Sequence, residues 1–250
     1  ADDDACFIVW NIKTGEIVMK IDVPFNGAIG AAVWLTFDEG KMGFAFGCAD
    51  GSIHIYWERK DSRNMFDFIS MVDSPGPIEC LSFDAAHRRL ASVGGGCLQV
   101  WKLTETGSLV KFNEERVQKP VVAKFVKFID EGSSVIVCYL ESHEISCYTI
   151  EPWSLKWTKL VPTRIGHAYL CSADGTFLYV SNLLDGVDQY RFPNMEKVQS
   201  FTHPISVNLP LQVACAARGQ WIVCGGDSGF ARVFNRRTGQ VLQILDHCES

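Results

Sequence analysis

The stretch "VWNIKTGEIV", residues 9–18, is repeated in outline by "VFNRRTGQVL", residues 233–242. In each stretch an aromatic residue and an asparagine precede a basic Thr-Gly turn, and an apolar run follows the turn. Other aromatic residues recur in similar settings between the two, at successive intervals of 46, 45, 47, 42 and 44 residues. A period of this length is typical of proteins assembled from repeated structural units. The six recurring aromatic residues are Trp10, Tyr56, Trp101, Tyr148, Tyr190 and Phe234.

Each repeat contains four short strand-like runs separated by turns. In the repeat around Trp101 these runs are "PIECLSF", "RLASVG", "CLQVW" and "SLVKF", which are apolar or alternate between apolar and polar residues. Most repeats place a glycine in the tight turn between the second and third runs, where it supplies the positive φ of a hairpin turn. Four short antiparallel strands per period predict one blade of a β-propeller. The turn residues are Asp50-Gly51, Gly95-Gly96, Asp185-Gly186, Ser228-Gly229 and, without glycine, Ser142-His143.

The strand count predicts an all-β chain of five full blades preceded by a half-blade. The half-blade holds only a third and a fourth strand, "CFIVW" and "EIVMKI". We therefore expect a piece of a seven-bladed ring, whose first strand lacks a neighbour and whose last blade exposes apolar side chains. A closed six-bladed ring with an unusual seam is the alternative. The predicted boundaries are 1–21 for the half-blade and 22–72, 73–116, 117–162, 163–203 and 204–250 for the blades.

Three stretches resemble the turn and third strand of WD40 repeats: "CADGSIHIYW", "VGGGCLQVWKL" and "GGDSGFARVFNRRTG". The resemblance extends over essentially the whole chain through the spacing of the repeats. WD40 blades typically join a histidine before the first strand, an aspartate at the tight turn and a third-strand tryptophan by hydrogen bonds. The last repeat retains His203 and Asp227, with Phe234 in place of the tryptophan. The resemblance implies a propeller that serves as a scaffold for protein–protein interaction.

Composition and charge narrow the class of protein. The chain has 250 residues, of which 47% are hydrophobic and 21% charged, as expected for a globular fold. A net charge of −6 and the lack of a long Lys/Arg run argue against nucleic-acid binding. The longest apolar run, residues 28–37, is too short to span a bilayer. Ten cysteines without a C-x-x-C pair favour a reducing intracellular compartment, the cytoplasm or the nucleus.

The connections from the fourth strand of one blade to the first strand of the next carry proline, aromatic and histidine residues. Proline lowers the cost of ordering a loop, and an aromatic side chain provides an anchor for a protein or peptide partner. Because the six histidines fall in different repeats or turns, we expect no metal site, and nothing indicates a cofactor. The sequence thus predicts a non-enzymatic interaction protein. Its predicted contact residues are Pro24, Phe25, Pro75, His203 and Pro204.

Two enzyme hypotheses stand beside this prediction. His87, Asp130 and Ser228 follow the chain order of a trypsin-like triad, but the repeats place His87 and Ser228 in turns of opposite kinds. The stretch "DGTFLYVSN", residues 174–182, resembles the repeats of lactonase-type propellers. That resemblance implies hydrolysis of a sugar lactone in a central pocket. Among the starts of the first strands, only His167 and Lys124 are polar enough to serve there.

A third resemblance concerns lipids. The stretch "FNRRTG", residues 234–239, is similar to the Phe-Arg-Arg-Gly run with which lipid-binding propellers hold phosphoinositide head groups. Thr238 interrupts the run, and "NIKTG" occupies the same place in the half-blade. We therefore expect a turn between the third and fourth strands at this position.

Overall fold

The computed structural model describes residues 4–37, 40–58, 65–113, 117–171, 175–207 and 209–246, and the structural statements below concern these residues. The chain divides into two compact units, which are described separately. Unit 1 comprises residues 1–137 and 147–155, and unit 2 comprises residues 138–146 and 156–250.

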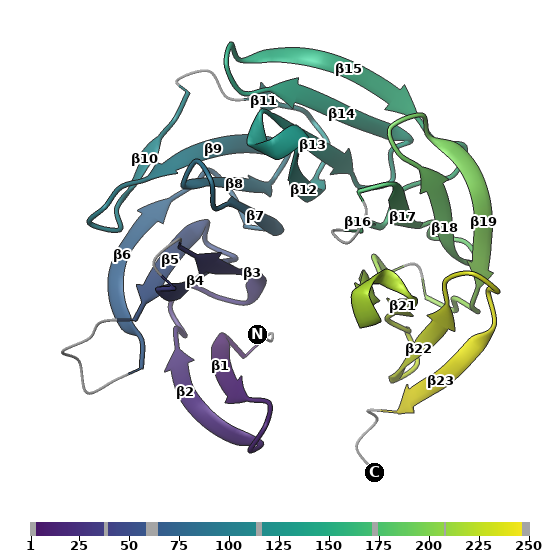
Figure 1. The fold of residues 1–250 in the computed structure, drawn as a ribbon, viewed down its shortest axis with the longest axis horizontal. Helices are drawn as coiled ribbons and strands as arrows, with labels where there is room; N and C mark the ends of the chain where they lie inside the picture. The colour runs from purple at the N-terminus through teal and green to yellow at the C-terminus, as the bar shows by residue number, and fades with distance from the viewer. Residues whose placement is uncertain are drawn as a thin grey trace. The chain divides into compact units, whose positions relative to one another are not determined.

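Unit 1 begins with a two-stranded sheet and continues with two complete blades (Figure 1). Within each sheet, successive strands pair in antiparallel fashion, as in a meander. The outer strand of the second blade is interrupted, so that two short strands pair with opposite ends of the third strand. The half-blade contains β1 (Cys6–Asn11) and β2 (Glu16–Asp22); the first blade contains β3 (Ile29–Thr36), β4 (Met42–Cys48), β5 (Ser52–Trp57) and β6 (Asp67–Asp73); the second contains β7 (Cys80–Asp84), β8 (Arg89–Gly94), β9 (Cys97–Leu103), β10 (Leu109–Lys111) and β11 (Val117–Gln118).

Unit 2 contains two further blades, and the residues of one more blade are divided between the units. Helix occurs in the described residues only as two short 3-10 turns, η1 (Asp130–Gly132) and η2 (Ala217–Gly219). The predicted fold class is confirmed: the chain is all-β, with five four-stranded blades of the β-propeller type and a two-stranded half-blade. The divided blade contains β12 (Ala123–Ile129), β13 (Ser134–Tyr139), β14 (Glu144–Thr149) and β15 (Ser154–Leu160); the unit 2 blades contain β16 (His167–Leu170), β17 (Phe177–Ser181), β18 (Gly186–Arg191) and β19 (Glu196–Thr202), then β20 (Val213–Ala216), β21 (Trp221–Cys224), β22 (Phe230–Asn235) and β23 (Val241–Asp246).

One hydrogen bond recurs at the tight turn before the third strand. The residue that follows the fourth strand donates its backbone N–H to a carbonyl of this turn, which ties the end of the blade to its middle. In the half-blade the acceptor is Ala5, whose φ of 57° is that of a turn residue. The bonds are Val23 to Ala5, Ser74 to Gly51, Lys119 to Gly96, Val161 to His143 and His203 to Asp185.

In four of the sheets the fourth strand carries a β-bulge opposite the step into the recurring aromatic residue of the third strand. The extra residue bends the fourth strand there, so the aromatic residue meets the same irregularity in each of these sheets. In the second blade the break between β10 and β11 falls at the same place, because Trp101 pairs with Lys111 whereas Leu98 pairs with Val117. The register shifts lie at Val9/Trp10, Ile55/Tyr56, Gln189/Tyr190 and Val233/Phe234.

Neighbouring sheets of each unit pack face to face through apolar side chains. The half-blade meets the first blade through Phe7, whose ring stacks on Phe44 and Phe46 with centroids 4.9 and 4.8 Å away. The first and second blades share a core that includes Ile78 and Trp101. The two blades of unit 2 share another, which includes Tyr179, Phe201, Ile222 and Phe234.

Candidate interaction surface

The loop between β2 and β3 presents a fully exposed aromatic side chain. Phe25 is 97% exposed, although the backbone around it is held in place. Asn26 donates its N–H to the carbonyl of Val23, and its own carbonyl accepts the N–H of Asp50 from the next tight turn, at 3.0 and 3.1 Å. The chain therefore fixes the base of this side chain while leaving the ring in solvent.

A chain of side-chain hydrogen bonds runs from this loop into the core of the first blade. Asn26 Nδ2 donates to Asp50 Oδ2 at 2.7 Å, and Asp50 Oδ1 accepts both the N–H and the hydroxyl of Ser52 at 2.9 and 2.7 Å. The Ser52 hydroxyl lies 3.1 Å from Nε2 of His54. These bonds hold the carboxylate of Asp50 in its ionised form and lower its pKa, although burial opposes them.

His54 is the last residue in this series of hydrogen bonds and lies in the interior of the blade. It is only 6% exposed, and its ring stacks on Phe46 with centroids 4.7 Å apart. Burial lowers the pKa of His54, while the carboxylates of Asp50 and Asp73 oppose the change. The neutral imidazole is therefore part of the structure that supports the exposed loop.

Lowering the pH from about 7.5 to about 5.5 is expected to reduce the free energy of unfolding. The pKa of folded His54 lies below the value of about 6.5 for an exposed histidine, so the unfolded chain takes up the proton first. The contribution of neutral His54 to stability is fully present above about pH 6.5, the pKa of the unfolded chain. It is lost as the pH falls below that value toward the lower pKa of the folded state. Urea titrations at several pH values would measure the slope. The variant His54→Phe can still stack on Phe46, and its free energy of unfolding should fall less than that of the wild-type chain when the pH is lowered. An equal fall in the two chains would contradict this role of His54.

The other predicted contact residues lie in three different loops, and they differ in exposure. Pro24 and Pro75 are exposed, and Pro75 lies in the loop between β6 and β7. In unit 2, Pro204 is exposed, whereas the adjacent His203 is fully buried and lies beside Arg232, with Nδ1 and Nη1 2.5 Å apart. The structure therefore places His203 in the core and not on the loop surface.

Five of the six recurring aromatic residues are buried, from Tyr190 at 0% exposed to Tyr56 at 8%. Trp10 differs, being 53% exposed on the half-blade. Trp101 donates its indole N–H to the Ser92 hydroxyl at 2.9 Å, which gives this tryptophan a serine partner inside its own blade.

A polar side chain lies two positions before five of these aromatic residues, and its role was not predicted from the sequence. In unit 2, Asp188 is fully buried and accepts hydrogen bonds from Thr163 and Ser200 at 2.9 and 2.7 Å, as well as an ion pair from Lys197 at 2.8 Å. These partners lower the pKa of Asp188 against the effect of its burial. The sequence pattern that could have indicated these side chains is a polar residue, then any residue, then an aromatic residue. It occurs as "HIY", "QVW", "SCY", "DQY" and "RVF".

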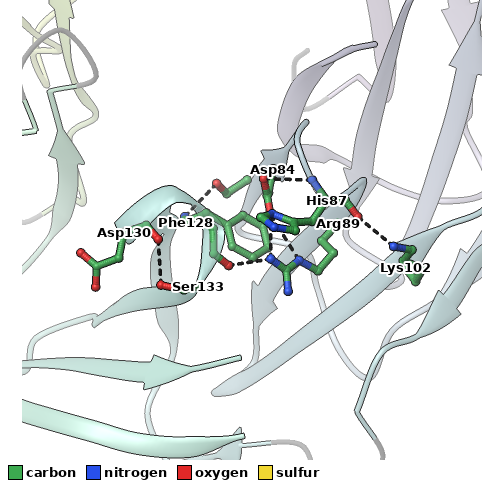
Figure 2. A network of polar contacts seen from close by, with 9 residues as sticks. Asp84, His87, Arg89, Lys102, Phe128, Asp130 and Ser133 are labelled. Carbon is green, nitrogen blue, oxygen red and sulfur yellow. Dashed lines mark hydrogen bonds and ion pairs between the residues drawn. The ribbon is translucent and has the colours of Figure 1, made fainter. Parts of the chain in front are cut away.

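A second polar network joins the second blade to the strand that follows it (Figure 2). Asp84, at the end of β7, accepts hydrogen bonds from Nε and Nη2 of Arg89 at 3.2 and 3.0 Å. Nδ1 of His87 lies 2.9 Å from the same carboxylate, and Lys102 donates to the carbonyl of His87 at 3.0 Å. Arg89 and Asp84 are both buried, whereas His87 is half exposed.

Arg89 extends this network to η1. Its Nη2 donates to the carbonyl of Gly132 at 2.7 Å, and the N–H of Phe128 on β12 donates to the Ser82 hydroxyl at 3.2 Å. Gly132 has a φ of +85°, and a Cβ there would lie 2.3 Å from Asp84 Oδ2. Only glycine fits this close approach. We call Asp84, His87, Arg89 and Gly132 the inter-blade latch.

The residues of the enzyme hypotheses are engaged in other contacts. His87 is paired with Asp84, and the Ser133 hydroxyl donates to the backbone carbonyl of Asp130. Lys124 forms an ion pair with Glu79, 45 residues earlier, at 2.5 Å. His167 begins β16 and accepts the N–H of Val213 at 3.4 Å.

The described residues contain no cluster of three or more ligands able to hold a metal ion. Nor do they contain a helix long and apolar enough to cross a membrane. Asp174, in the stretch similar to lactonase repeats, lies outside the described residues. Arg236 and Arg237 lie in the turn between β22 and β23, where a turn was expected.

Comparison with known proteins shows a distant similarity to a plant protein. No family model matches the chain. The chain is 22% identical over 177 residues to SEC12-like protein 2 of Arabidopsis thaliana. The aligned region covers 68% of this chain and 43% of that protein, so the chain spans less than half the length of this relative.

Proposed function

We propose that the chain is a WD40-type propeller segment that acts as a non-enzymatic scaffold for protein–protein interaction. The observation that carries the proposal is the pairing of a 97% exposed Phe25 with a loop held by hydrogen bonds. The repeated blades and the likeness to SEC12-like protein 2 support it.

The low cost of binding favours this loop as a contact surface. An exposed aromatic ring that enters a pocket contributes strongly to affinity, and a loop that is already ordered loses little entropy on association. A carboxylate also borders the loop, since Asp50 is exposed and accepts a hydrogen bond from Asn26, the neighbour of Phe25, whereas Asp22 is paired with Lys20 at 3.3 Å. The partner that fits is therefore a protein or peptide with an apolar pocket bordered by basic side chains.

Phe25→Ala is expected to lower recovery of the bound partner by about tenfold or more, the usual effect of truncating an aromatic hot spot. Quantitative affinity capture from cells, with wild-type and variant chains as baits, measures the change. Ile12→Ala is the matched control because Ile12 is 95% exposed in the turn between β1 and β2. If Phe25→Ala recovers the same proteins as the wild-type chain, this loop is not the binding surface.

A further inference from the structure

Asn26 is the only asparagine in the sequence that is followed by glycine. An asparagine loses its amide nitrogen without an enzyme when the backbone nitrogen of the next residue attacks its side-chain carbonyl carbon. A side chain on that next residue hinders the attack, so glycine, which has no Cβ, favours it most. The Asn26–Gly27 step is therefore where this reaction is expected first. The residues that follow the other seven asparagines are Ile12, Met65, Glu114, Leu183, Met195, Leu209 and Arg236.

The backbone around this step leaves the attacking nitrogen accessible. Gly27 has a φ of 75° and lies in the loop before β3, in which Pro24 and Phe25 are exposed. Among the described residues, the N–H of Gly27 donates no hydrogen bond. The carbonyl of Asn26 accepts the N–H of Asp50 at 3.1 Å. That bond polarises the peptide group between Asn26 and Gly27, which makes its N–H easier to deprotonate.

The nitrogen that would leave lies beside a carboxylate. Nδ2 of Asn26 donates to Oδ2 of Asp50 at 2.7 Å. Although burial acts against them, the hydrogen bonds from Ser52 and Asn26 lower the pKa of Asp50, so this carboxylate is ionised at neutral pH. An anion at this position stabilises the positive charge that develops on the departing nitrogen. The same bond restrains the amide before the reaction, so conversion in the folded chain is expected to be slow.

The reaction balances without an enzyme, a metal or an oxidant. The backbone nitrogen of Gly27 forms a bond to Cγ of Asn26, and the bond from Cγ to Nδ2 breaks. The proton of the Gly27 nitrogen leaves with Nδ2 as ammonia, and a succinimide ring remains. Water then opens the ring at either of its carbonyl groups, which gives aspartate or isoaspartate at position 26.

Neither product keeps the contacts that Asn26 makes with Asp50. A carboxylate has no proton to donate at neutral pH, so the oxygen that replaces Nδ2 faces Oδ2 of Asp50 as a like charge. Isoaspartate also adds one carbon atom to the backbone, which displaces the carbonyl that accepts the N–H of Asp50. Both products therefore weaken the attachment of this loop to the tight turn between β4 and β5.

We propose that Asn26 is a self-modification site, at which spontaneous deamidation replaces the hydrogen bond to Asp50 with a pair of like charges and releases the loop that carries Phe25. The step is one-way because ammonia is lost, so the fraction of chains converted increases with their age. The release follows from the contacts of Asn26 alone, and it does not depend on what Phe25 binds.

Peptide mapping by mass spectrometry tests the reaction. The purified, folded chain is incubated in mildly alkaline buffer, and most chains are expected to gain the mass of one deamidation at Asn26. Asn182 and Asn235 are matched controls because each accepts backbone N–H groups in a turn and precedes a residue with a side chain, Leu183 or Arg236. These two should stay intact. If Asn26 is converted no faster than they are, the proposal is overturned.

Hydrogen exchange at the N–H of Asp50 tests the release of the loop. In Asn26→Asp this N–H is expected to exchange about tenfold faster or more, the effect of losing a hydrogen bond to a charged group. The N–H of Lys119, which donates to Gly96 at 2.9 Å in the second blade, is the internal control and should not change. Unchanged exchange at Asp50 would overturn the proposal.

Converted wild-type chain gives the same measurement without a variant. Its extra negative charge separates it from unconverted chain by ion exchange, so a failure of Asn26→Asp to fold does not prevent the test. Exchange at Asp50 that is equal in the two fractions would likewise overturn the proposal. Capture of a partner is not a readout of these experiments, so this site and the proposed binding surface at Phe25 can fail independently.

Discussion

Gly94→Ala is expected to lower the free energy of unfolding by about 3 kcal/mol or more, at the upper end of the cost of overpacking. Gly94 ends β8, and the backbone of the loop from β6 crosses directly over it. A Cβ at this position would lie 1.5 Å from the carbonyl oxygen of Pro77 and 2.7 Å from its carbonyl carbon. Both contacts are with backbone, so no side-chain rotation relieves them. The loop or the strand must move.

Urea or thermal unfolding of the variant measures this cost. Gly225→Ala is the control, since Gly225 follows the second strand of its own blade and the nearest atom to a Cβ there is 3.6 Å away. That substitution should change stability by less than about 1 kcal/mol. If Gly94→Ala unfolds at the same denaturant concentration as Gly225→Ala, the close approach of the loop at Pro77 is not present in solution.

Arg89→Ala is expected to destabilise the chain by about 3–5 kcal/mol, the usual cost of leaving a buried charge without its partner. Arg89 is 4% exposed and supplies two hydrogen bonds to Asp84 and one to the carbonyl of Gly132. Its removal leaves the carboxylate of Asp84 with the ring of His87 and removes the bond to η1. The midpoint of urea unfolding reports the loss.

The double variant Asp84→Leu/Arg89→Met separates charge from packing. It removes both ions from the inter-blade latch, so it should recover part of the stability that Arg89→Ala loses. Lys102→Ala is the surface control, because Lys102 is exposed and only its ammonium bonds to the carbonyl of His87. A loss from Arg89→Ala no larger than that from Lys102→Ala would show that the latch does not stabilise the fold.

The strands and turns of this chain could be predicted because they depend on local sequence. Alternating runs and turn glycines act over a few residues, and the aromatic period locates the third strand of each blade. The exposure of the recurring aromatic side chains was harder to predict. Trp10 and Trp101 have similar local settings, yet one is 53% exposed and the other 1%, because burial depends on the sheet that packs against each.

The contacts of the two polar networks could not be predicted from local pattern. Arg89 meets Gly132, 43 residues later, and Asn26 meets Asp50, 24 residues later. The first contact depends on how successive blades pack, and the second on how the loop before β3 meets the tight turn between β4 and β5. For His203 the local pattern was misleading about exposure, since the residue lies in the loop after β19 but its ring is buried. The packing of the following blade decides its environment.

The meander pairing of the strands has a consequence for how the chain acquires its structure. Within the sheets described, each ladder joins strands that are close in sequence, so forming a blade requires closing only short loops. Proteins with such local contacts fold faster than β-proteins whose strands pair over long distances. Repeats that depend chiefly on their neighbours can nucleate singly and propagate, so a blade can form on the ribosome before the next has been synthesised.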